Sequence, residues 1–196
     1  STVKLPLAIL VLQKIRKLQS LGIPITVETP FMVLFSENII KKTDTTHPNN
    51  KLTIAHLIKK IFLVSDNTAY NYLFDFIGRD DANKAIHSIG IPNFKLSHKF
   101  SDPENNNSTP RFIFFNQKGD TIYNQAPIIS SQKIKNTHLE GVLKGKGYVK
   151  DGTVIEESMD FSEKNYASIE ALNQILKRII FPKQFSKNEQ FKIEQE

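Results

Sequence analysis

One helix near the start of the chain can be stable only inside a larger fold. Residues 5–21 read LPLAILVLQKIRKLQSL, and their apolar side chains recur at helical spacing and cover the remaining faces as well. The first two turns of this helix are apolar all round and leave no face for solvent, so other elements must enclose them. Pro6 fits a helix only in its first turn, which places the helix start close to Ser1, and Gly22 is expected to end the helix.

The composition fits one globular domain. The chain has 196 residues, 39% of them hydrophobic, and fourteen Phe, which is enough to bury a sizeable core. It contains no run of 18 apolar residues, so no membrane-spanning helix is expected. The formal net charge is +6, but the lysines are scattered among asparagines and glutamates, which favours a solvated basic surface over a nucleic-acid partner. Without cysteine the chain has no disulfide, no catalytic thiol and no cysteine zinc site.

Apolar periodicity predicts four more helices and a hairpin. Two amphipathic helices, over 54–62 and 70–77, meet at the polar triplet Ser65-Asp66-Asn67, and a short helix follows over 80–89. A last helix is predicted from Ser168 to Ile180. The segments RFIFF and TIY predict a β-hairpin with its turn at Lys118-Gly119-Asp120.

The remaining stretches carry weaker patterns. Residues 23–51 hold three prolines and the short apolar segment FMVLF, and are expected to be irregular and partly exposed. Residues 101–110 form a loop by composition, and 124–160 have no clean period. We expect 1–182 to form the domain and 183–196 to be a polar tail or connector.

Two short motifs carry chemistry. The pair Ser1-x-x-Lys4 places both side chains on one face of the first helix, although Ser130-x-x-Lys133 shows that such pairs also arise by chance. A helix N-cap would equally explain Ser1, and a solvated first-turn lysine would explain Lys4, although a cation there opposes the helix dipole. Ser65-Asp66-Asn67 occurs once and would also suit an N-cap, because all three residues favour helix starts.

Together the motifs resemble those of the class A β-lactamase-like serine hydrolases, the superfamily of β-lactamases and penicillin-binding proteins. Ser1-x-x-Lys4 opens a buried helix, and Ser65-Asp66-Asn67 lies 64 residues later between two helices, as in that family. The closing segment FSEKNYASIEALNQILKRIIFP is similar to members from the Bacteroidota. The resemblance spans most of 1–182 and implies an α/β (α+β) fold, a helical subdomain on an antiparallel sheet, with this chain covering mainly the helical part of a partial domain.

The resemblance also implies the roles of the residues. Ser1 would be the nucleophile and Lys4, one turn on, the base that takes its proton. Ser65 would complete a proton path to the leaving nitrogen, and Asn67 would hold Lys4 and bind the substrate's side-chain amide. Asp66 is expected to cap and brace the junction. The reaction would be acyl transfer through an acyl-serine intermediate.

The chain departs from the family pattern in two places. The third motif, Lys-Thr-Gly or a close variant, is absent, so we expect a fragment whose residues alone are inactive. Class A β-lactamases also carry a glutamate that activates water for deacylation, and Glu104 is the only glutamate in the corresponding loop, 101–110. An exposed loop acid is the favoured interpretation of Glu104, and without that base the acyl-enzyme would be long-lived.

The sequence thus predicts β-lactam hydrolysis in the periplasm or outside the cell, by a monomer acting on a small β-lactam or peptidoglycan-like molecule. The alternatives are a penicillin-binding D,D-peptidase or esterase of the same superfamily, a catalytically silent relative, and an N-terminal-serine amidohydrolase. No cofactor is expected, and no metal, because the five histidines share no metal-binding spacing.

Overall fold

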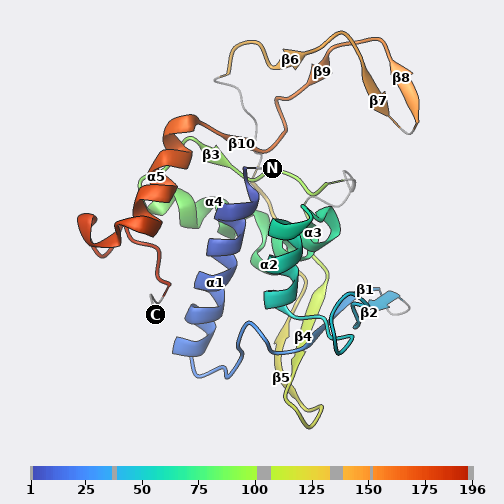
Figure 1. Cartoon of the computed structure of the whole chain (residues 1–196), viewed down its shortest axis with the longest axis vertical. Helices are drawn as coiled ribbons and strands as arrows, with labels where there is room; N and C mark the ends of the chain where they lie inside the picture. Colours follow the sequence, from blue (N-terminus) through green and yellow to red (C-terminus); the bar gives the residue numbers. More distant parts are fainter. Residues whose placement is uncertain (1, 37–38, 101–106, 133–138, 151, 194–196) are drawn as a thin grey trace.

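The computed structural model describes residues 2–36, 39–100, 107–132, 139–150 and 152–193. Helix α1 (Lys4–Ser20) runs through the middle of the fold, as its apolar faces predict (Figure 1). It packs against α2 (Ile54–Leu63), α3 (Asn67–Ile77) and α4 (Arg79–Ser88), and α5 (Ile169–Ile180) lies on its other side. Leu7, Leu10 and Val11 are fully buried among these helices.

All five predicted helices are confirmed, and polar side chains cap the starts of α2, α3 and α5. The side chain of Thr53 caps α2 by accepting the N–H of His56, and Ser168 caps α5 by accepting that of Ala171. Helix α1 starts at Lys4, which places Pro6 in the first turn. Among the described residues, no helix is both long and apolar enough to cross a bilayer.

Four antiparallel strands form a sheet below the helices, in the order β2-β1-β4-β5. The predicted hairpin is confirmed as β4 (Arg111–Phe115) and β5 (Thr121–Gln125), and Gly119 takes the positive φ that its turn requires. With the helices, the sheet gives the mixed α/β class that the motifs implied.

The expectation for 23–51 was wrong at FMVLF. This segment is strand β1 (Phe31–Ser36), which pairs with β4 and with β2 (Ile39–Lys41). Its partner β4 follows about 80 residues later, so local periodicity could not reveal the pairing. The ring of Phe31 lies tilted against Phe112 and Phe114 with centroids 5.6 and 5.0 Å apart, which buries Phe31, whereas Phe35 near the end of the strand is exposed.

The stretch without a clean period contains short strands that pair with one another. β6 (Leu143–Lys144) pairs with β9 (Met159–Asp160), and β7 (Tyr148–Lys150) pairs with β8 (Thr153–Ile155), forming an arm that projects from the helices (Figure 1). β3 (Phe94–Lys95) pairs with β10 (Tyr166–Ala167) and returns the chain to α5. After α5 a short helical turn, η2 (Pro182–Gln184), leads to Phe191, whose side chain is buried in the core.

Candidate active site

The site is built on the tight junction between α2 and α3. Ser65 lies there with φ of 54°, the left-handed region that a residue with a Cβ adopts only at a cost of about 1–2 kcal/mol. Asp66 is the N-cap of α3, and its Oδ1 accepts the N–H of Ala69 at 2.8 Å. The junction leaves Ser65 and Asn67 exposed to solvent at the surface of the helical part.

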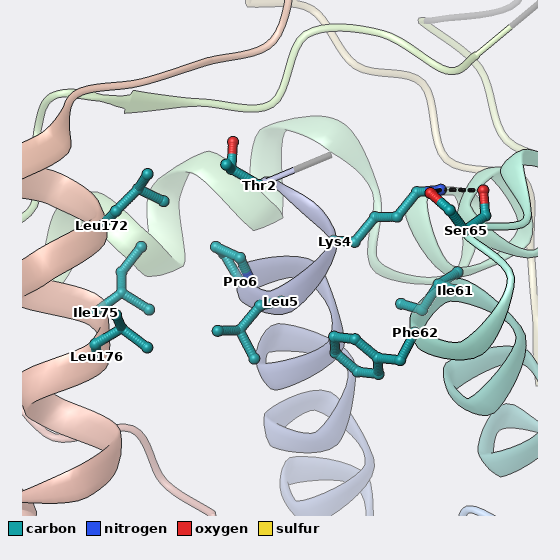
Figure 2. A pocket seen from close by; sticks show the side chains of 10 residues that line it. All are labelled: Thr2, Lys4, Leu5, Pro6, Ile61, Phe62, Ser65, Leu172, Ile175 and Leu176. Atoms are coloured by element: carbon teal, nitrogen blue, oxygen red, sulfur yellow. Dashed lines mark hydrogen bonds between the residues drawn. The ribbon is translucent and has the colours of Figure 1, made fainter.

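The side chain of Lys4 reaches this junction from the first turn of α1. Its side chain is buried, with 3% of the residue exposed, and its Nζ donates to Ser65 Oγ at 2.9 Å and to Asn67 Oδ1 at 3.1 Å. The same nitrogen donates to the carbonyl of Ser65 and lies 3.4 Å from that of Asp66. Figure 2 shows the side chain extending from the first turn of α1 to Ser65. A buried amine is therefore placed within hydrogen-bond reach of two exposed polar side chains.

The environment of Lys4 makes the loss of its proton easier than it is in water. Burial lowers the pKa of the ammonium, and the negative charge of Asp66 acts in the opposite direction. A lysine must lose its proton before it can act as a base, so a lowered pKa increases the fraction of active amine at neutral pH.

The rings of Phe100 and Tyr70 form an aromatic wall on another side of Lys4. The Phe100 ring centroid lies 5.7 Å from Lys4 Nζ, and the ring stacks on Tyr70 at 4.7 Å. Asn71 of α3 fixes the Phe100 backbone from both directions, because its Nδ2 donates to the Phe100 carbonyl and its Oδ1 accepts the Phe100 N–H, both at 2.8 Å. The wall is thus held by the helix that starts at Asn67.

A mainly apolar pocket of about 420 Å³ opens beside the lysine. Figure 2 shows α5 on one side, the first turn of α1 in the middle and α2 on the other side. Its polar lining comes from Thr2, Lys4 and Ser65, and its apolar lining from Leu5, Pro6, Ile61, Phe62, Leu172, Ile175 and Leu176. An apolar hollow with a few convergent polar groups is typical of small-molecule sites.

The structure therefore brings together three of the residues that the sequence predicted: Lys4, Ser65 and Asn67. Ser1 and Glu104 lie outside the described residues. Phe100 and Asn71 were not predicted from the sequence. The signal for Asn71 was weak, an asparagine four residues after Asn67 on the same helix, and no pattern marked Phe100.

This arrangement, a buried lysine under a Ser-Asp-Asn junction in a mixed α/β fold, is that of a serine hydrolase of the β-lactamase superfamily. A family model described as "Beta-lactamase enzyme family" (Beta-lactamase2) matches residues 1–193, and the chain belongs to this family. No curated protein and no solved structure gives a significant match.

Proposed function

We propose that the protein hydrolyses β-lactams through an acyl-serine intermediate on Ser1, in the periplasm or outside the cell. In the first step Lys4 Nζ takes the proton of Ser1 Oγ while that oxygen attacks the lactam carbonyl carbon. The C–N bond of the lactam then breaks as the proton passes through Ser65 Oγ to the ring nitrogen. Water releases the product in a second step, with Glu104 as the candidate base.

The observation that carries the proposal is the contact between Lys4 Nζ and Ser65 Oγ at 2.9 Å. Ser65 Oγ accepts from the lysine, so its own O–H remains to donate to a leaving nitrogen. The contact with Lys4 orients Asn67 in a similar way. Its Oδ1 accepts a hydrogen bond from Lys4, so its Nδ2 is left to donate to an amide carbonyl of the substrate. The lysine thus orients both side chains towards one reacting molecule.

A second candidate, a penicillin-binding D,D-peptidase or esterase with a long-lived acyl-enzyme, is favoured by the aromatic wall. Phe100 stands against Lys4, where it supplies no group that could activate water. Both candidates form an acyl-serine, but they differ in their own substrate and, for a penicillin-binding peptidase treated with a β-lactam, in the rate of deacylation.

Intact-mass measurements on the full-length gene product would separate these candidates. We expect a penicillin to add its own mass to the protein, and the Ser1→Ala variant to stay unmodified. An adduct that decays within seconds to minutes supports β-lactam hydrolysis, and Glu104→Gln should then prolong its life. A persistent adduct on Ser1 supports the second candidate. A folded protein that forms no adduct would contradict both β-lactam hydrolysis and a penicillin-binding peptidase, and would leave an esterase acting on another substrate or a catalytically silent relative.

A further inference from the structure

A bridge of three charged side chains lies behind the Ser65 junction. Lys60, in the last turn of α2, places its Nζ 2.9 Å from Asp44 Oδ2 and 3.2 Å from Asp66 Oδ2. The three side chains are 19%, 10% and 23% exposed, so the bridge is largely shielded from water. Ion pairs in such surroundings are screened much less by salt than pairs on the surface.

Further hydrogen bonds fix Asp44, at one end of the bridge. Asp44 Oδ1 accepts the N–H and the hydroxyl of Thr46 at 3.0 and 2.6 Å, and the Asp44 N–H donates to the carbonyl of Asn50. Burial would raise the pKa of Asp44, but the hydrogen bonds from Thr46 and Lys60 outweigh it and hold the pKa well below its usual range. Asp44 is therefore a fixed negative charge to which Lys60 is tied.

Asp66, at the other end of the bridge, is part of the Ser65 junction. The backbone carbonyl of Lys60 accepts the N–H groups of Val64 and Asp66, while its ammonium holds the Asp66 carboxylate. Asp66 lies between Ser65 and Asn67, the two residues whose side chains contact Lys4. Lys60 thus binds the junction through both its main chain and its side chain. These contacts help to maintain the positive φ of Ser65, which is a strained conformation.

We infer that Lys60 is a positioning residue for acylation: through Asp66 it holds the Ser65 junction in place, and it partly neutralises the Asp66 carboxylate. The inference rests on the proposed function and adds to it a residue that touches neither the substrate nor Lys4. The charge of Asp66 opposes the lowering of the Lys4 pKa, and Lys60 weakens that opposition. Loss of the Lys60 charge should therefore raise the pKa of Lys4.

The other titratable groups around the bridge do not obscure this effect. His56 Nε2 lies 3.7 Å from Asp44 Oδ2 and meets the His47 ring edge to face, and burial lowers the pKa of His56, which favours its neutral form. Burial raises the pKa of Tyr72, so that phenol keeps its proton through most of the alkaline range where Lys4 titrates. Lys59, the neighbour of Lys60 in the sequence, is exposed and serves as the matched control.

The test is an NMR titration of the lysine side chains, labelled with ¹³C at Cε, in the full-length protein. Lys60→Met should raise the pKa of Lys4 by about 0.5–1, the effect of losing one nearby charge in a partly solvated site. Lys60→Arg and Lys59→Met should leave it unchanged. Asp44→Asn should lower it, because Lys60 then turns wholly to Asp66. Asp44→Asn decides the question if Lys60→Met does not fold. An unchanged Lys4 pKa in folded Lys60→Met or folded Asp44→Asn would overturn the inference.

The acylation rate with a penicillin, followed against pH, gives the functional counterpart. The pH of half-maximal acylation should move upward in Lys60→Met and return in Lys60→Arg, whereas a merely structural role would lower the rate without moving that pH. If the wild-type protein forms no adduct at any pH, the proposed function fails, and the NMR values still decide the role of Lys60.

Discussion

Lys14 should make the stability of the protein rise with pH in the mildly alkaline range. It lies in the third turn of α1, where its Nζ donates to the carbonyl of Phe76 and, at 2.7 Å, to Oε1 of Gln125. Its Nζ also lies 4.6 Å from the centroid of the Phe76 ring. Burial lowers the pKa of Lys14 to about 8, Asp81 opposes this and Lys17 adds to it.

The direction of this pH dependence follows from the protonation of Lys14 in the folded and unfolded states. Below about pH 8 Lys14 is charged whether the chain is folded or not, so the folded state bears the full cost of burying the charge. Between pH 8 and the ordinary lysine pKa of 10.5, the folded protein loses the proton first and the unfolded chain binds more protons, so stability increases. From about pH 7.5 to about pH 9.5 the gain from this one group is about 2 kcal/mol.

Urea unfolding, followed by circular dichroism at several pH values, measures this gain. The difference in unfolding free energy between wild type and Lys14→Met isolates Lys14, because all other groups titrate alike in both proteins. Lys59→Met, which replaces an exposed lysine of α2 that is not among the groups acting on Lys14, is the control and should follow the wild-type pH dependence. Parallel wild-type and Lys14→Met curves over this range would refute the reasoning.

Two further substitutions test the local structure of the site. Asn71→Ala removes both hydrogen bonds that fix Phe100 and should lower the free energy of unfolding in urea by about 2–3 kcal/mol. The control, Asn49→Ala at an exposed position, should lower it by less than about 0.5 kcal/mol. Equal losses in the two variants would mean that Asn71 does not hold the aromatic wall. Ser65→Gly and Ser65→Ala both lose the hydroxyl and should both slow acylation strongly, but the glycine variant should be more stable by about 1 kcal/mol because only alanine pays for the positive φ; an alanine variant of equal or greater stability would contradict the strain.

The sequence predicted those parts of the structure that local patterns determine. Helix α1 follows from its apolar faces and Pro6, and the junction at Ser65-Asp66-Asn67 follows from two amphipathic helices that meet at polar residues. The contact of Lys4 with this junction was predicted from the resemblance, and the hydrogen bonds to Ser65 and Asn67 fit it.

The parts that the sequence missed depend on contacts between distant residues. Strand β1 forms because β4 pairs with it, and its own residues looked like an irregular apolar segment. Asp44 lies in a polar stretch that resembled an exposed loop, yet it is 8% exposed because Lys60 and Thr46 satisfy its carboxylate. The spacing between Lys60 and Asp66 matches no shared helix face, so no periodicity could connect them.

The pocket beside Lys4 also has a consequence for how the protein is made. Its walls come from α1 and from α5, and about 150 residues separate the end of one helix from the start of the other. At usual rates of synthesis, the ribosome needs roughly 10–30 s to cover that distance. Throughout this interval the nascent chain has only the α1 side of the pocket, so the apolar side chains of Leu5 and Pro6 lack the facing wall from α5. A factor that binds such apolar segments during translation should therefore raise the yield of folded protein more than one that acts after release.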